Sequence, residues 1–299
     1  SRIAACRRFL SCKIFRRLSL NFFFEKFNET PFYPQKEAET EVFQANRENG
    51  GKRFYFPRVL RYNRRKGGNA MKLTTAGESH GKALLAIVEG LPAHLKIDKA
   101  KINGALALRQ SGYGRGARQK IEKDEAEILS GVRGGGTLGS PLALCIRNRD
   151  YESWKAYMSD GECDLSSRAV TRVRPGHADL SGMLKYGQSD ARNILERASA
   201  RETAIRVAAG EIFRQYLSAL GVEIAGYVRE VCGVKDGGRY AFNELAASKK
   251  TGLGMIDPEA ERAAEEKVSA LKSAGDTAGG VVEVRGRGLK SGFGSCMTY

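Results

Sequence analysis

The amino-acid sequence of 299 residues predicts an α+β fold with antiparallel sheets. Short apolar runs bounded by Gly and Pro have the length and composition of strands, and longer stretches with capping residues and an apolar stripe have the pattern of helices. The two kinds of segment do not alternate strictly along the chain, as they would in successive βαβ units. A doubly wound parallel sheet is therefore not expected.

The first elements follow Met71. The apolar run 83–89 ends at a Gly and a Pro and suits a buried strand. Asp98 is placed to cap a helix whose apolar side chains, Leu106 among them, recur at helical spacing. A second strand is expected over 142–146, after Ser-Pro.

The second half of the chain shows the clearest helix signals. Ser199 and Glu202 have the spacing of a capping box, and an apolar stripe follows them. A last helix is expected between the cap Asp257 and Gly275, and a strand over 281–284.

Charge divides the chain into two parts. Residues 1–70 contain 16 basic and 6 acidic residues, a net charge of +10, whereas residues 71–299 have a net charge of only +6. No helical or strand period is sustained in 1–70. We therefore expect 1–70 to be a separate extension and 71–299 to be the folded domain.

Three origins of the extension compete. An organelle transit peptide would be poor in acids, and six glutamates weaken that interpretation. A nucleic-acid-binding tail would explain the charge and the aromatic residues, but no binding motif is present. The third is translated upstream DNA: Lys66-Gly67-Gly68 can be encoded by codons that contain a bacterial ribosome-binding sequence, shortly before Met71. We favour the third.

Several function classes find no support. The six cysteines form no CxxC pair or repeated spacing, which argues for reduced thiols in the cytoplasm and against a zinc site. The Gly-rich segment 131–136 fits neither a P-loop nor a dinucleotide-binding fingerprint. No apolar run is long enough to cross a bilayer. We expect no metal, no membrane and no nucleic acid as partners.

Two of the three histidines, His80 and His177, lie in Gly-rich loops with arginines nearby. Histidine changes charge near neutral pH, so either could donate a proton to a ligand. Glycine lets the backbone approach a ligand, and arginine matches phosphate or carboxylate. The arginines in such loops, or near the cap at Ser199, include Arg109, Arg115, Arg174, Arg197 and Arg201. Together they predict a site for a small polyanion.

Four segments in order resemble the signatures of the chorismate synthase family. They are Thr75–Gly81 (TAGESHG), Ile128–Val132 (ILSGV), Arg174–Asp179 (RPGHAD) and Ala198–Ala204 (ASARETA). The similarity runs from Met71 to the end of the chain.

The resemblance implies a carbon–oxygen lyase of the shikimate pathway, which serves aromatic amino acid biosynthesis. Such an enzyme eliminates phosphate from 5-enolpyruvylshikimate 3-phosphate by an anti-1,4-elimination to give chorismate. It requires reduced FMN and catalyses no net redox change. The resemblance also implies helices between two antiparallel sheets, a homotetramer and a bacterial cytoplasmic location.

The family's residue roles carry over by position. His177 would protonate or hydrogen-bond the reduced flavin, and His80 would act as a general acid. Arg109 and Arg115 match positions that bind anions, either the substrate or NADP in members that use NADPH to reduce their own flavin. The remaining candidates are a flavin-contacting segment and two anion ligands: Arg197, Ala198 and Ser199, with Arg174 and Arg201.

Family members continue beyond the position of Tyr299, with further flavin-binding loops. We therefore expect this chain to be a fragment that is inactive as it stands. Two alternatives remain open. One is a non-catalytic flavin- or phosphate-binding module, and the other is a basic nucleic-acid-binding protein, suggested by the net charge of +16.

Overall fold

A computed structural model describes residues 71–114, 121–245 and 252–291. Its strands are β1 (Lys72–Ala76), β2 (Ala83–Glu89), β3 (Glu127–Ser130), β4 (Val132–Arg133), β5 (Gly136–Thr137), β6 (Leu142–Arg147), β7 (Glu223–Val231), β8 (Val234–Lys235) and β9 (Gly280–Arg287). Its helices are α2 (Lys99–Gln110), α4 (Tyr151–Met158), α5 (Asp179–Tyr186), α6 (Arg192–Ala198), α7 (Thr203–Ala219), α8 (Phe242–Leu245) and α9 (Pro258–Ser273).

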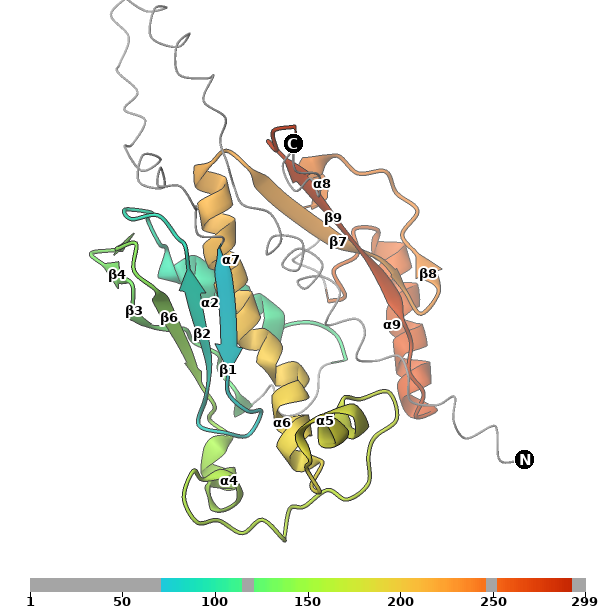
Figure 1. The fold of residues 1–299 in the computed structure, drawn as a ribbon. Coiled ribbons are helices and arrows are strands. Elements are labelled where there is room, and N and C mark those ends of the chain that lie inside the picture. The colour runs from blue at the N-terminus through green and yellow to red at the C-terminus, as the bar shows by residue number, and fades with distance from the viewer. Residues whose placement is uncertain (1–70, 115–120, 246–251, 292–299) are drawn as a thin grey trace, which may run out of the picture.

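A four-stranded antiparallel sheet in the order β1-β2-β6-β3 forms the first layer (Figure 1). Along β2, Leu84, Ala86 and Val88 are fully buried, whereas Leu85 and Ile87 on the other face are 39% and 43% exposed. This alternation is what a half-buried strand requires. The sheet therefore has one core face and one open face.

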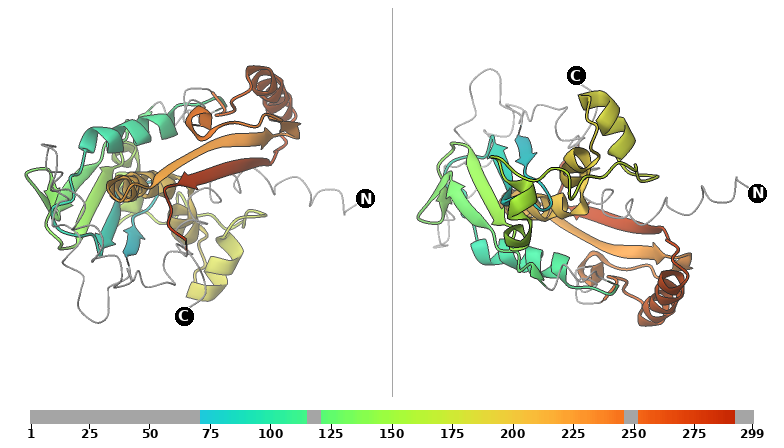
Figure 2. Two further views of the ribbon diagram at one scale, coloured as in Figure 1. Left: turned by 90° about the horizontal axis from the view of Figure 1, so that it is seen from above. Right: turned by 90° about the horizontal axis from the view of Figure 1, so that it is seen from below.

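Helices α2 and α7 lie side by side and pack on the core face, as Figure 2 shows from above and below. Asp98 caps α2 by accepting hydrogen bonds from the backbone N–H groups of Ala100 and Lys101. On α7, Ile205 and Ile212 are fully buried against the strands. This contact is the main core of the molecule.

A second antiparallel sheet has the order β8-β7-β9 and continues directly from the end of α7. Helix α9 begins at Pro258 behind the cap Asp257 and packs near β8. Asp236 is buried in the turn after β8, where it accepts hydrogen bonds from the Tyr240 hydroxyl and the backbone N–H groups of Ile256 and Asp257. These bonds join the turn to the start of α9.

Helices α4, α5 and α6 gather at the end of the first sheet near the β1–β2 loop (Figure 1). Helix α5 approaches α6 closely at Gly182. A Cβ added to this glycine would lie only 2.4 Å from a methyl carbon of Ile194. Arg197, near the end of α6, donates hydrogen bonds to the backbone oxygen and the hydroxyl of Thr75 on β1. These contacts position the candidate site.

The α+β class with antiparallel sheets is confirmed, as are the expected strands and the caps at Asp98 and Asp257. The strand over 83–89 was expected to be buried, and only one of its faces is. The capping box at Ser199 forms only in part. Ser199 accepts a hydrogen bond from the backbone N–H of Arg201 and begins a 3-10 turn, and α7 starts at Thr203. The second bond of a capping box, from the backbone N–H of Ser199 to the Glu202 carboxylate, is not found among the described residues, because this carboxylate binds Thr75 and Arg206 instead.

Two expectations fall on residues outside the described ranges: the extension 1–70 and the anion ligand Arg115. Among the described helices, none is long and apolar enough to span a membrane.

Candidate active site

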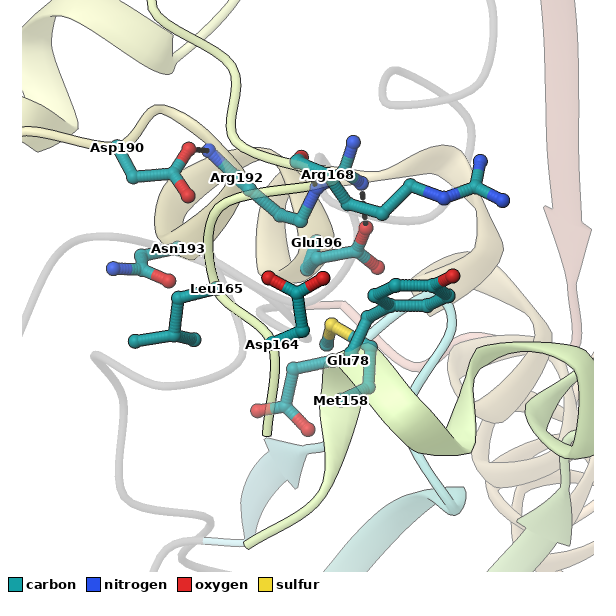
Figure 3. Close-up of a pocket in the computed structure, with 10 residues that line it drawn as sticks. Glu78, Met158, Asp164, Leu165, Arg168, Asp190, Arg192, Asn193 and Glu196 are labelled. Atoms are coloured by element: carbon teal, nitrogen blue, oxygen red, sulfur yellow. Dashed lines mark hydrogen bonds and ion pairs between the residues drawn. The ribbon is translucent and has the colours of Figure 1, made fainter. Parts of the chain in front are cut away.

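A shallow pocket of about 220 Å³, open to solvent, lies between α4, the loop after it and the start of α6 (Figure 3). The pocket is lined by acidic, basic and uncharged side chains: Glu78, Asp164, Asp190 and Glu196; Arg168 and Arg192; Tyr157, Met158, Leu165 and Asn193. Its wall at Glu196 adjoins the loop that carries His80.

The loop between β1 and β2 is held in a fixed shape. Gly77 has a φ of 104°, and a Cβ there would lie 2.2 Å from the Ala83 carbonyl oxygen, so the turn requires glycine. The side-chain amide of Asn148 donates hydrogen bonds to the carbonyl oxygens of Glu78 and Gly81. The loop therefore presents His80 from a rigid backbone.

Glu196 on α6 is the partner of His80. Both carboxylate oxygens of Glu196 lie 2.9 Å from His80 Nδ1, and the backbone N–H of His80 donates to Oε2 at 2.9 Å. The Glu196 side chain is only 1% exposed, and Arg192 donates to its Oε1 at 2.9 Å. Burial opposes ionisation of Glu196, but the hydrogen bonds and charge of His80, with Arg192, hold its pKa below its ordinary value.

Trp154 on α4 covers the His80 ring. The two ring centroids are 4.1 Å apart with an interplanar angle of 30°. The guanidinium carbons of Arg168 and Arg192 lie 4.7 Å and 5.1 Å from the Trp154 ring centroid. His80 is thus in contact with two helices that come from different parts of the chain.

His177 also pairs with a carboxylate. Its Nδ1 donates a hydrogen bond to Asp179 at the start of α5, and Arg174 donates to Asp179 and to Nε2 of His177. Burial opposes ionisation of Asp179, yet hydrogen bonds from Arg174 and the charge of His177 lower its pKa to about 2. The His177 side chain is 4% exposed, and Arg174 Nη2 lies 3.2 Å from its Nε2.

The structure places Arg109 and Arg201 in a buried network between α2 and α7. Both guanidinium groups contact Asp124, and Arg201 also donates to the Asn148 side chain. Arg201 is 7% exposed, and the Arg109 side chain is 10% exposed. In this structure both side chains bind protein carboxylates, and their predicted binding of an external anion stays a prediction.

The segment Arg197, Ala198 and Ser199 joins α6 to the 3-10 turn. The Arg197 guanidinium bridges Thr75 and Glu202 and remains 39% exposed. Arg174 is similarly paired and 41% exposed. These two arginines keep part of their charge open to a ligand.

The described residues bring His80, Arg197 and Ser199 together at the C-terminal end of α6, where His80 binds Glu196. Helix α5, which follows His177, packs on the same helix. No direct contact between His80 and His177 is found in the described ranges. No cluster of His, Cys, Asp or Glu in the described ranges could hold a metal ion.

Sequence reasoning missed Glu196, Arg192 and Trp154. One signal was available, since Arg192 and Glu196 stand four residues apart, the spacing of an ion pair on a helix. Nothing in the sequence indicated that this pair would face His80, 116 residues earlier.

Comparisons with known proteins agree with one another. A family model described as chorismate synthase matches residues 71–299. The chorismate synthase of Geobacter metallireducens is 52% identical over 234 residues, which cover 77% of this chain and 59% of the relative. That of Caldicellulosiruptor bescii is 49% identical over 229 residues, 75% of this chain and 60% of the relative.

A solved structure titled "Crystal Structure of Chorismate Synthase" aligns with a TM-score of 0.58 and 40% identity, covering 72% of this chain and 58% of the other. The chain therefore spans about three-fifths of the length of the curated relatives that it matches.

Proposed function

The chain belongs to the chorismate synthase family, and on that premise we propose that the protein converts 5-enolpyruvylshikimate 3-phosphate into chorismate and phosphate with the aid of reduced FMN. One observation carries the proposal from the geometry. The His80 ring, within the family-like segment TAGESHG, is held by a buried carboxylate beside a pocket that contains arginines.

The reaction class is a 1,4-elimination. A C–H bond and a C–O bond to phosphate break: the proton passes to a base, the C–H electron pair enters the new double-bond system, and the C–O electron pair leaves with phosphate, so there is no net oxidation. Phosphate leaves more readily when a nearby acid or cation neutralises its developing charge. The site must therefore supply a proton donor and cations.

The donor set fits an anionic cofactor such as FMN. Arg174 and Arg197 keep 41% and 39% of their side chains exposed while their inner N–H groups bind protein oxygens. The guanidinium of Arg168 stacks on Trp154 and Tyr157, while its backbone oxygen accepts a hydrogen bond from Arg192. Stacking leaves the guanidinium N–H donors able to face a phosphate. We propose that Arg197, Ala198 and Ser199 contact the flavin, which when bound would supply electron density that assists loss of phosphate.

The two histidines have different accessibility. His80 is 20% exposed at the side chain and can exchange a proton at Nε2. His177 is covered, with Arg174 at its Nε2, so we propose that it hydrogen-bonds or protonates the flavin once Arg174 binds an anion instead. Arg109, Arg115 and Arg201 remain proposed anion ligands, for substrate or NADP.

Further parts of the proposal rest on the family resemblance. They are NADPH as a reductant of the flavin, a homotetramer and a cytoplasmic location. A folded domain over 71–299 that follows a separate extension is proposed from the charge and patterning of the sequence. Light scattering coupled to gel filtration tests the tetramer, and reduction of FMN by NADPH under anaerobic conditions tests the reductase step.

The main test is an anaerobic assay with the substrate and chemically reduced FMN. Two proteins are compared: the chain itself, and residues 71–299 joined to the part of the Geobacter metallireducens enzyme beyond the matched region. We expect chorismate and phosphate in equal amounts from the joined protein, with the flavin still reduced at the end. Phosphate without chorismate, or flavin oxidised in proportion to product, would contradict the proposal.

The two alternative functions predict different results in this assay and in binding measurements on the same proteins. A non-catalytic flavin- or phosphate-binding module predicts FMN binding without product in either protein. A nucleic-acid-binding protein predicts affinity for nucleic acid that falls steeply with salt and persists in residues 71–299 alone. The net charge of +6 on that part favours weak binding.

A further inference from the structure

The surroundings of His80 define a cluster of four side chains: His80, Glu196, Arg192 and Trp154. We propose that Glu196 is a positioning residue that holds the hydrogen of the neutral His80 ring on Nδ1, and that Trp154 fixes the plane of that ring, so that Nε2 is the nitrogen that exchanges a proton with a ligand. The ligand is the one of the function proposed above, and the tautomer itself can be tested without it.

The tautomer follows from the contacts at Nδ1. An ionised carboxylate only accepts hydrogen bonds, and both Glu196 oxygens lie 2.9 Å from Nδ1. The backbone N–H of His80 binds the same carboxylate at 2.9 Å, and the backbone N–H of Ser79 donates to the Glu196 carbonyl oxygen at 3.0 Å. A hydrogen on Nδ1 can therefore be donated to the Glu196 carboxylate, whereas a lone pair on Nδ1 would be repelled by the negative charge of that carboxylate.

Glu196 is suited to remain ionised. Its side chain is almost fully buried, so an unpaired charge would be costly. Arg192 supplies the compensating positive charge from one turn earlier on α6. The carboxylate thus has donors on both of its oxygens and little freedom to turn away from His80.

Trp154 restrains the tilt of the His80 ring, which the hydrogen bonds at Nδ1 do not fix. Its stacked ring covers one face of the imidazole, and Arg192 contacts both Trp154 and Glu196. Arg192 therefore links the group that fixes the ring nitrogen to the group that fixes the ring plane. A ligand must approach His80 at the ring edge or at the uncovered face.

Nε2 remains available at that edge. The Asp150 carboxylate lies 3.7 Å from it, close enough for an ion pair with the protonated ring but beyond hydrogen-bonding distance. In the neutral ring Nε2 carries the lone pair, and in the protonated ring it carries the proton that can be given to a leaving oxygen. The same logic operates wherever a carboxylate orients a catalytic histidine.

The direct test is an NMR measurement of the histidine ring nitrogens through their two-bond couplings to ring protons. The chain has three histidines, and His80→Gln identifies the His80 signals by their loss. At a pH where the ring is neutral, we expect hydrogen on Nδ1 and none on Nε2. A neutral His80 with its hydrogen on Nε2 would overturn the proposal, whatever any variant does.

Three variants test whether Glu196 is the cause. In Glu196→Gln, His80 should no longer be found only with its hydrogen on Nδ1. The glutamine side chain has one acceptor oxygen, which cannot accept from the His80 backbone N–H, Arg192 and Nδ1 together. Glu196→Asp keeps a carboxylate and should restore that form in part. Glu211→Gln is the matched control, since Glu211 is 6% exposed and pairs with Arg214 of its own helix, and no contact with a histidine is found for it in the part of the chain that the structure describes. An unchanged tautomer in a folded Glu196→Gln protein would refute the role of Glu196.

Kinetics and fluorescence add two further readouts. In the joined protein, Glu196→Gln should lower kcat roughly 10- to 1,000-fold with little change in KM, as expected for a misoriented acid. An equal fall in kcat in the Glu211→Gln protein would contradict a specific role of Glu196.

Trp154 is the sole tryptophan of the chain, so its fluorescence emission should change in the His80→Gln protein. Unaltered emission would show that the two rings do not stack.

Discussion

His80 and His177 each have a carboxylate partner at Nδ1, Glu196 and Asp179 respectively, but their surroundings differ at Nε2. Glu196 binds His80 and leaves Nε2 with only Asp150 at 3.7 Å among described groups, whereas Arg174 covers Nε2 of His177. A histidine that must act on a ligand needs an open ring nitrogen. In this structure His80 meets that condition directly, and His177 requires a movement of Arg174.

His177→Ala tests the second histidine. If His177 serves the flavin, the variant of the joined protein should lose roughly 10- to 10,000-fold in turnover with saturating reduced FMN, while circular dichroism shows retained folding. Turnover near that of the parent protein would remove His177 from the mechanism.

Asp179 gives a pH-dependent prediction. Its pKa falls from an ordinary value of 3.8 to about 2 on folding, so its ionised form stabilises the folded state above about pH 4. That contribution is lost as pH falls from 3.8 towards 2. Asp179→Asn should lower the free energy of unfolding at pH 7 by about 1–3 kcal/mol, because Arg174 loses a buried partner.

The measurement for Asp179 is urea unfolding of both proteins between pH 2 and pH 7. The difference between Asp179→Asn and the parent should shrink as the pH approaches 2. A difference that stays constant over the whole range would contradict the assigned pKa.

At the scale of elements, the packing of α5 on α6 depends on one glycine. Gly182 faces Ile194 so closely that a Cβ would lie 2.4 Å from it, whereas a Cβ on Gly104 of α2 would meet nothing within 4 Å. Both glycines lie in helices, where alanine is intrinsically better by roughly 0.5–1 kcal/mol. The two sites therefore predict opposite outcomes for the same substitution.

Gly182→Ala should destabilise the protein by about 1–3 kcal/mol through overpacking, and Gly104→Ala should stabilise it by up to about 1 kcal/mol. Thermal and urea unfolding measure both. Equal effects of the two substitutions would show that α5 does not lie this close to α6.

Local patterns in the sequence predicted the elements better than they predicted the site. The caps at Asp98 and Asp257 and the strand over 83–89 depend on neighbours in the chain, so they could be predicted directly. The apolar run of that strand did not indicate that only one of its faces is buried. The start of α7 was misjudged by a turn, because Glu202 is drawn to Thr75, 127 residues earlier in the chain. The partners of His80 were missed for the same reason: contacts between distant segments leave no local pattern.

At the scale of the whole molecule, family membership concerns residues 71–299, and the sequence predicts that 1–70 are a separate extension. Deleting residues 1–70 should change the melting temperature by no more than a few degrees, since a segment without a sustained apolar period contributes little to a core. A large fall in the melting temperature would show that the extension is part of the domain.

The central claim is that the substrate of the family binds beside His80, Glu196 and Trp154. Titration of the Trp154 fluorescence with 5-enolpyruvylshikimate 3-phosphate tests it most directly, because this single tryptophan stacks on His80. With reduced FMN present, we predict a saturable change in emission with the dissociation constant that calorimetry gives. Calorimetric binding without any change in Trp154 emission would place the substrate elsewhere and contradict the account.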